Sequence, residues 1–224
     1  PPIMRADAVA GIILDASGKL GISLTDKQLD QLCSYAELVG KWRRLASLTS
    51  ASTPESFASA HIVDCLSVRP YISGPRVMDV GSGAGLPGCV LAIALPHLGF
   101  TLLEPRHKRV RFLTQARIDL ELSNVEVLSE RVEAYRPAQA YDDIIARAFG
   151  SMSQLLEKTR THQRPGTRII AMKGALDPDE VPNCVVPPGS LRIVPLDVPG
   201  YRERNLVIVE FAGDPITNGL GEGK

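Results

Sequence analysis

The segment DVGSGAGLPG, Asp79–Gly88, contains four glycines and closes the apolar run RVMDV, which starts at Arg76. Pro87 then opens a second apolar run, GCVLAIAL. A short buried strand, a glycine turn and a helix, in this order, are typical of open α/β sheets in which the backbone closely approaches a ligand. The segment therefore predicts an α/β fold with a binding site at the carboxyl end of its first strand.

Strand-like and helix-like segments alternate after Arg76. The strand-like segments are RVMDVG, GFTLLE, NVEVLSE, YDDIIARAF, TRIIAMKG, LRIVPLDV and RNLVIVEF. Helical segments begin at Pro87, at Lys108 with Val110, Leu113, Ala116 and Leu120 facing inward, and around Ser153–Thr161. Strands separated by helices favour a parallel sheet that is covered on both faces. The last two strands have no helix between them, so the pattern predicts a Rossmann-like, seven-stranded, mostly parallel sheet with an antiparallel end.

The chain before this sheet reads as helical. Thr25 and Gln28 have capping-box spacing and precede an apolar stripe, which predicts a helix over about Asp26 to Leu45. Thr53 and Pro54 form a second helix-start pair, and that segment ends before Gly74. The predicted organisation is an N-terminal helical cap over residues 1–75, a catalytic domain over 76–212 and a mobile tail over 213–224. The Pro-rich stretch Ala175–Ser190 is predicted to be connecting chain.

Charge and composition limit the possible partners. The chain has 25 basic and 25 acidic residues, so overall attraction to phosphates is absent and any nucleic-acid contact must use local clusters. No apolar run has the roughly 20 residues that a bilayer helix needs, and we expect a cytoplasmic monomer without membrane contact. The four cysteines and four histidines lack metal-ligand spacing, so no metal is expected and the cysteines are interpreted as reduced core thiols.

Two acids near the glycine turn indicate the class of ligand. Glu104 ends the next strand, where an acid accepts hydrogen bonds from a ribose diol. Asp79 lies two positions before Gly81, and a carboxylate there disfavours a pyrophosphate but suits a cationic ligand. S-adenosylmethionine fits both features, because it has a ribose and positive charge but no phosphate. Gly88 is also explained by helix packing alone. An NAD(P)-dependent oxidoreductase and a non-catalytic nucleotide-binding module remain as alternatives.

Several blocks together resemble one family. In order they are LVGKWRRLASLTS, HIVDCLSVRPYI, VMDVGSGAGLPG, TLLEPRHKRVRFL, SERVEAY, ARAF, AMKG and ERNLVIVE. Over about Leu38 to Glu210 the chain resembles the bacterial glucose-inhibited division protein B family, the small-subunit ribosomal RNA guanine-N7 methyltransferases. The resemblance implies an S-adenosylmethionine-dependent methyltransferase fold, and methylation of a guanine in 16S ribosomal RNA or in the assembling small subunit.

The resemblance also assigns roles to individual residues. It implies that the methyl donor contacts Asp79, Gly81, Gly83 and Leu86, that Glu104 holds its ribose, that the backbone of Val132 and Glu133 borders the adenine, and that Arg147 closes the pocket. It implies that Lys173, Arg204 and His61 position the RNA. The chain departs from the family pattern at Ala46-Ser47-Leu48-Thr49 and at Asn205, so specific contacts by Ser47 and Asn205 stay open.

Guanine N7 has a lone pair and no proton, so the implied reaction needs no general base. A cytosine-C5 enzyme would need a nucleophilic cysteine, usually after proline, and an exocyclic-amine enzyme would need a different motif where this chain reads ARAFG. A ribose 2′-O enzyme needs a lysine base, so Lys173 keeps that alternative open. For Arg106–Arg109, RNA contact and a solvated helix face stay equally open. Trp42 is expected to pack, and His61 with Asp64 reads either as a surface pair or as a site near RNA.

Overall fold

The computed structural model describes residues 2–176 and 189–212, and these form a seven-stranded sheet in the order β3-β2-β1-β4-β5-β7-β6. The strands are β1 (Arg76–Val80), β2 (Gly99–Leu103), β3 (Val125–Leu128), β4 (Asp143–Arg147), β5 (Arg168–Lys173), β6 (Gly189–Pro195) and β7 (Asn205–Phe211). β1 to β5 run parallel, whereas β7 lies antiparallel between β5 and β6. The predicted fold class, including the antiparallel end, is confirmed.

The chain leaves β1 on one side, toward β2 and β3, and returns to pair β4 on the other side of β1. This reversal places the carboxyl ends of β1 and β4 side by side. In open α/β sheets, ligands bind in the crevice at such a switch point. The glycine turn after β1 lies there.

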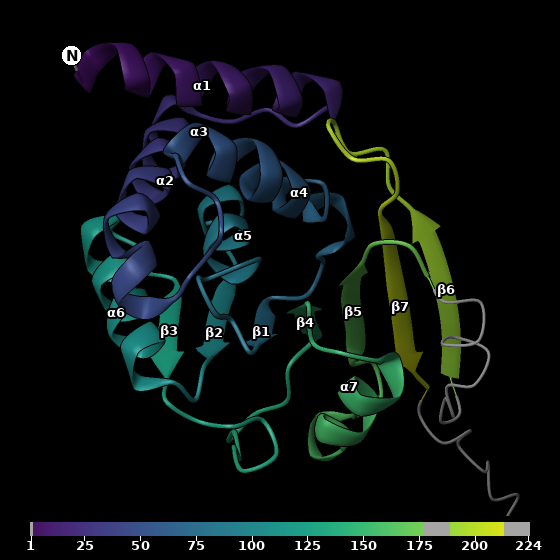
Figure 1. Cartoon of the computed structure of the whole chain (residues 1–224). Coiled ribbons are helices and arrows are strands. Elements are labelled where there is room, and N and C mark those ends of the chain that lie inside the picture. The colour runs from purple at the N-terminus through teal and green to yellow at the C-terminus, as the bar shows by residue number, and fades with distance from the viewer. Residues whose placement is uncertain (1, 177–188, 213–224) are drawn as a thin grey trace, which may run out of the picture.

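Helices cover the sheet as Figure 1 shows. The N-terminal helices gather on one side with α5 and α6, and α7 lies on the other side near β4 and β5. Their bounds are α1 (Pro2–Lys19), α2 (Asp26–Ala46), α3 (Pro54–Phe57), the π-helical turn η1 (Ala58–Ile62), α4 (Val63–Leu66), the 3-10 turn η2 (Arg69–Tyr71), α5 (Gly88–Ala94), α6 (His107–Asp119), α7 (Met152–Lys158) and the 3-10 turn η3 (Arg160–His162).

Helix α2 begins where the sequence predicts. The Thr25 side chain accepts a hydrogen bond from the Gln28 N–H, and the Gln28 side chain accepts one from the Thr25 N–H, which is the predicted capping box. The helix ends at Ser47, whose φ of 51° is left-handed. The second predicted helical segment is less regular than expected, because the π-helical turn Ala58–Ile62 interrupts it.

The apolar side chains form a large cluster on each face of the sheet. One cluster joins the N-terminal helices to α5 and α6 and includes Tyr35, Phe57, Leu91 and Phe112. The other lies between the opposite face of the sheet and α7. Each fully buried large apolar side chain contributes about 1.5–3 kcal/mol to folding, so the N-terminal helices are held mainly by this shared core. Whether residue 75 is a domain boundary stays a prediction.

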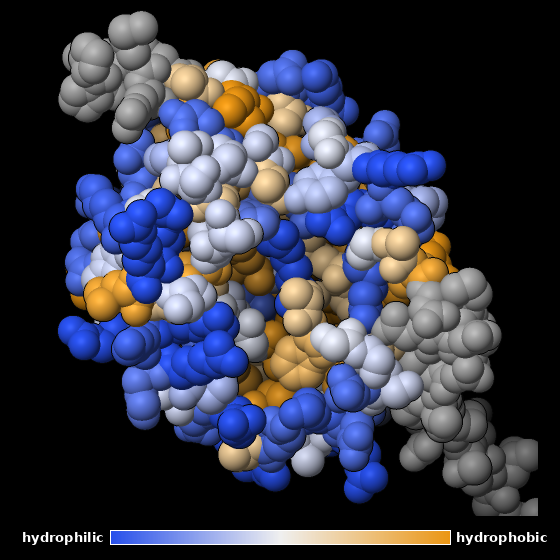
Figure 2. Space-filling model, in the orientation of Figure 1, coloured by the Kyte–Doolittle hydropathy of each residue, from blue (hydrophilic) through white to orange (hydrophobic). Residues whose placement is uncertain are grey.

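The outer surface is mostly hydrophilic in the view of Figure 2, and hydrophobic residues show in a hollow near its centre. Among the described residues, no helix combines the length and the apolar character needed to cross a bilayer. The predicted tail, Cys184 and most of the predicted connecting chain lie outside the described residues.

Candidate functional site

The glycine turn follows β1 in a backbone conformation that glycine adopts at low cost. Gly81, Gly83 and Gly85 have φ values of +71°, +59° and +86°, which disfavour residues with a Cβ. The turn is held against the neighbouring strand, because the N–H groups of Gly81 and Ser82 both donate to the Leu103 carbonyl. Gly88 has a different reason, since a Cβ there would lie 2.5 Å from Asp79 Oδ2. Close packing of α5 on β1 therefore explains Gly88.

Asp79 lies beneath this turn and is only 1% exposed. Its Oδ2 accepts a hydrogen bond of 3.0 Å from the Gly88 N–H, so the carboxylate caps the start of α5. Its Oδ1 is buried and has no hydrogen-bond partner within the described residues. Burial raises the pKa of Asp79 to about 7, against the lowering effects of the Ser82 side chain and of the Gly88 bond. The acid is therefore first a support for the turn, with one oxygen left for a donor group.

Glu104 meets the same turn from the end of β2. Its Oε2 accepts the Gly83 N–H at 2.9 Å, and its Oε1 accepts the Arg106 N–H at 2.9 Å. Arg109 Nη1 lies 3.7 Å from Oε2, and Glu104 as a whole is 2% exposed. The sequence correctly placed this acid beside the glycine turn. The structure adds that the acid ties the turn to the start of α6.

The other residues predicted to contact the donor are Leu86, Val132 and Glu133. Leu86 is partly buried against the core. The Val132 carbonyl lies 2.8 Å from His162 Nε2, and exposed Glu133 pairs with Lys158 at 2.7 Å. The Val132 side chain is buried in the apolar core and the Glu133 side chain pairs with Lys158, so only the backbone of these residues is considered for an adenine, and the Val132 carbonyl already meets His162.

A basic cavity of about 290 Å³ opens at the carboxyl ends of β4 and β5. Arg147 ends β4, Lys173 ends β5, and Arg204 directly precedes β7. All three cations line the cavity with Asp64, so the fold brings together residues that are far apart in the sequence. Lys173 Nζ donates a hydrogen bond to the Gly150 carbonyl.

Asp64 is not the surface partner of His61 that one interpretation of the sequence expected. It is 1% exposed and forms ion pairs with Arg147 Nε at 3.3 Å and with Arg204 Nε at 3.0 Å. The surface-pair interpretation is wrong because Arg147 at the end of β4 and Arg204 just before β7 both bind the buried carboxylate. Burial raises the pKa of Asp64, and the two arginines oppose that shift.

His61 also contacts Arg147. Its Nδ1 lies 2.8 Å from Arg147 Nη2 and its Nε2 lies 3.1 Å from Thr49 Oγ1. A guanidinium only donates hydrogen bonds, so Nδ1 is the acceptor and Nε2 carries the proton. Burial, followed by the charge of Arg147, lowers the pKa of His61 to about 4. A neutral His61 therefore orients a guanidinium.

The turn after β4 connects the two parts of the site. Ala148 and Gly150 have φ values of +55° and +79°, a conformation that costs a non-glycine residue about 1–2 kcal/mol. Between them, Phe149 lies against the glycine turn, since a Cβ on Gly81 would be 3.3 Å from its ring. The glycine turn and the basic cavity are thus neighbours. Sequence reasoning missed Phe149, although the ARAF block contains it.

Tyr201 and Asn205 support the surroundings of Arg204 in different ways. The Tyr201 ring centroid lies 3.9 Å from the Arg204 guanidinium carbon, and the Tyr201 hydroxyl donates to the Ala60 carbonyl. Asn205 Nδ2 donates to the Gly174 carbonyl at 2.9 Å and so supports the cavity wall. The contact between Tyr201 and Arg204 is local, whereas those with Ala60 and Gly174 join segments that are far apart along the chain, and no local sequence signal predicts them.

The remaining candidates lie around the edges of the site. Trp42 packs with Phe112, their ring centroids 6.0 Å apart, as expected. Arg109 Nη2 donates to the Ser47 carbonyl at 3.1 Å, while Arg106 is exposed. Cys33, Cys65 and Cys89 are free thiols, in agreement with their interpretation as reduced residues.

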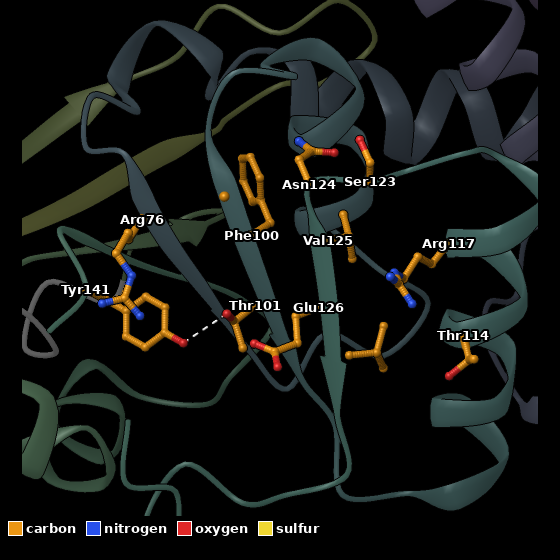
Figure 3. Close-up of a pocket in the computed structure, with 12 residues that line it drawn as sticks. Arg76, Phe100, Thr101, Thr114, Arg117, Ser123, Asn124, Val125, Glu126 and Tyr141 are labelled. Carbon is orange, nitrogen blue, oxygen red and sulfur yellow. Dashed lines mark hydrogen bonds between the residues drawn. The ribbon is translucent and has the colours of Figure 1, made fainter. Parts of the chain in front are cut away.

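Another cavity, of about 660 Å³, surrounds the edge strand β3 (Figure 3). Arg76, Gly99 and Val125, which line it, are the first residues of their strands. The cavity therefore lies at the edge of the sheet opposite the glycine turn. Figure 3 shows Tyr141 bonded to Thr101, and the Arg76 guanidinium lies 4.8 Å from the Tyr141 ring centroid. These polar groups bind one another, and the cavity has no part in the site described above.

Known proteins match both the fold and the sequence. The structure of the S-adenosylmethionine-dependent methyltransferase SibL in its apo form superposes with a TM-score of 0.57 at 14% identity, covering 92% of this chain and 74% of that chain. TrmN from Thermus thermophilus gives a TM-score of 0.52 at 20% identity, covering 75% and 52%. At such identities these matches show the fold alone.

The sequence comparisons are more specific. Ribosomal RNA small subunit methyltransferase G of Nitrosospira multiformis is 38% identical over 210 residues, 90% of this chain and 97% of that protein. The protein of the same name from Escherichia fergusonii is 40% identical over 191 residues, 85% and 92% of the two chains. The family model GidB, rRNA small subunit methyltransferase G, matches residues 28–207. The chain belongs to the GidB family, the rRNA small subunit methyltransferases G.

Proposed function

We propose that this protein transfers the methyl group of S-adenosylmethionine to N7 of a guanine in 16S ribosomal RNA. The observation that carries the donor assignment is the position of Glu104, whose carboxylate meets the Gly83 N–H at the carboxyl ends of β1 and β2. The residues fit this donor, because the glycine turn leaves its backbone accessible and Asp79 Oδ1 is a buried acceptor without a partner among the described residues. Family membership supports the RNA substrate.

When bound, S-adenosylmethionine supplies a methyl carbon activated by a sulfonium. Glu104 would accept hydrogen bonds from the ribose, the glycine turn from Gly81 to Leu86 would contact the donor, and the backbone at Val132 and Glu133 would border the adenine. Phe149, which lies against Gly81, would help to exclude water. Arg147 stands between the glycine turn and the basic cavity and would close the donor pocket toward the RNA.

The acceptor needs alignment more than proton transfer. Guanine N7 has no proton to remove, so a general base would contribute nothing to the step. The chain has to bring N7 within about 3–3.5 Å of the methyl carbon and in line with the sulfur. Positive charge develops on the purine as the methyl moves, so a cation pressed against N7 would oppose the reaction. We therefore assign Lys173, Arg204 and His61 to positioning of the RNA.

The partner that follows from this reaction is small-subunit ribosomal RNA, free or in the assembling subunit, and we propose that a cytoplasmic monomer acts on it. The test is to incubate labelled donor with small subunits from a strain that lacks this protein, and then to identify the methylated nucleoside by mass spectrometry. We expect 7-methylguanosine. A 2′-O-methylated nucleoside would support the ribose alternative instead, and saturable binding of NADH without binding of the donor would support an oxidoreductase.

A further inference from the structure

In the basic cavity, one buried carboxylate, that of Asp64, binds two arginine side chains. Arg147, Lys173 and Arg204 line the cavity with Asp64, and His61 beside it is neutral. Among the described residues, the guanidiniums of Arg147 and Arg204 share the single carboxylate of Asp64, so this group of three carries one positive charge in excess that a ligand can neutralise. The side chains of Arg147 and Arg204 are 16% and 22% exposed, while that of Asp64 is 2% exposed. The carboxylate therefore lies behind the guanidiniums, on the protein side of the cavity.

The contacts of Asp64 fix both guanidiniums in one arrangement. Each arginine meets a different carboxylate oxygen through its Nε. The terminal nitrogens make other contacts, and Arg147 Nη1 donates to the buried Cys65 Sγ at 4.0 Å. Arg147 Nη2 meets His61 Nδ1, and Arg204 Nη1 would lie 3.2 Å from a Cβ on Gly174, which is in the cavity wall.

The local backbone also favours this arrangement. The π-helical turn Ala58–Ile62 ends two residues before Asp64, and such turns, which are rare, occur frequently at functional sites. The same turn supplies His61 to Arg147 and the Ala60 carbonyl to Tyr201, whose ring lies against Arg204. One short segment thus orients both arginines, one directly and one through Tyr201.

We propose that Asp64 is a positioning residue that sets the spacing of Arg147 and Arg204, and that the two guanidiniums so held bind a phosphate of the RNA substrate in this cavity. Guanidinium pairs suit a phosphate because their N–H groups match its oxygens and each contact is charge-assisted. The inference rests on the proposed function and specifies which part of the RNA the site recognises.

The test compares two buried aspartates. Asp64→Asn keeps the shape of the side chain, but its amide nitrogen faces a guanidinium and cannot accept a hydrogen bond. Asp143→Asn is the matched control, because Asp143 is also buried and binds Arg168 at 2.6 Å, yet it lies at the other end of β4 from Arg147. Both changes break a buried ion pair and are expected to destabilise the fold. Only Asp64→Asn disturbs the cavity.

Three quantities are measured for each variant at a temperature where it is folded: KM and kcat for small subunits, Kd for S-adenosylmethionine, and the slope of log Kobs for RNA against log salt. For Asp64→Asn we expect KM to rise on the order of tenfold and the salt slope to become shallower by about one. The donor Kd is expected to stay within about twofold in Arg204→Gln, because Arg204, unlike Arg147, is not assigned to the donor pocket. Arg204→Gln leaves Asp64 paired with Arg147 and should change the same quantities, even if Asp64→Asn fails to fold.

Other outcomes would overturn the proposal. If Asp64→Asn and Asp143→Asn, or Arg204→Gln and wild type, have the same KM and salt slope, the pair does not bind an RNA phosphate. Weaker donor binding with an unchanged KM for RNA would instead assign the cavity to the carboxylate of the donor. If the wild-type protein methylates no small subunits, the proposed function itself fails and the inference falls with it.

Discussion

The two buried carboxylates at the glycine turn, Asp79 and Glu104, differ in how their oxygens are hydrogen-bonded. Glu104 has a backbone N–H on each oxygen, whereas Asp79 has one oxygen bonded to Gly88 and one without a partner among the described residues. A buried acceptor without a partner costs about 1–3 kcal/mol. Asp79 therefore costs stability in the free protein, and we attribute its presence to the donor that the proposed function requires.

Asp79→Asn tests this cost through pH. The unfolded pKa of aspartate is about 3.9 and burial raises the folded pKa of Asp79 to about 7. Between these values the native state binds more protons than the unfolded state, so this group makes stability fall as pH rises from about 4 to about 7. The free energy of unfolding is measured in urea at pH 5 and at pH 8. From pH 5 to pH 8 it should fall less in Asp79→Asn than in wild type, and the difference should be on the order of 1–3 kcal/mol.

The exposed residue Asp30 supplies the control for that experiment. Asp30→Asn also removes one carboxylate, and it should keep the pH dependence of wild type. An equal pH dependence in Asp79→Asn and wild type would contradict the assignment.

Glu104 and Lys173 should affect different substrates. Glu104→Ala removes the acceptor assigned to the ribose and two bonds that hold the glycine turn, so donor Kd should rise at least about tenfold. Lys173→Ala should leave donor Kd nearly unchanged and lower kcat/KM for small subunits. Calorimetry with the donor measures the first effect and a methylation assay measures the second. Glu157→Ala, at an exposed position of α7, is the control. The reverse pattern would show that the roles are exchanged.

At the scale of elements, the ends of helices account for much of what the sequence predicts. The capping box at Thr25 and Gln28 is local, so four residues of sequence are enough to identify it. The C-terminal end of α2 is different. Ser47 adopts a left-handed φ of 51° there, a conformation usually taken by glycine, which has no Cβ. Its carbonyl binds Arg109, which also approaches Glu104.

Ser47→Gly should therefore stabilise the protein. Glycine adopts the left-handed conformation at little cost, and we expect the free energy of unfolding to rise by about 0.5–1 kcal/mol. Lys41→Gly is the control, since Lys41 is an exposed position inside the same helix, where glycine costs about 1 kcal/mol relative to alanine. Thermal unfolding should shift upward for the first variant and downward for the second. A downward shift for both would mean that the serine side chain contributes more than its backbone costs.

The sequence predicts the sheet and the turn better than the site around Asp64, for a physical reason. Strand alternation, glycine turns and the lack of a helix between the last strands are local patterns, and each was sufficient to place its element. The ion pairs of Asp64 join α4 to β4 and to the chain before β7. Their partners are set by the fold, so an interpretation limited to the helix wrongly paired Asp64 with nearby His61. The π-helical turn was missed because it has no comparable periodic signal.

For the whole molecule, the charge balance determines how the RNA is held. The chain has 25 basic and 25 acidic residues, so long-range attraction to RNA is absent. The described basic cavity supplies three cations, Arg147, Lys173 and Arg204. Exposed Arg106 and Lys108 on and before α6 would add contacts only if that face also met the RNA.

Three phosphate contacts predict a shallow salt dependence for free 16S RNA. With about 0.7 counterions released per contact on single strands, the slope of log Kobs against log salt should be roughly −2. A slope of about −3.5 would instead require two further contacts, such as those of Arg106 and Lys108. Binding is measured by filter retention between low and moderate salt.

Glu121→Lys, which adds positive charge at an exposed position paired with Lys27, should strengthen retention of free RNA without changing kcat on small subunits. The affinity for free RNA should also be weaker than for the subunit, because the assembled particle presents the target nucleotide already ordered and the free RNA must lose conformational entropy on binding.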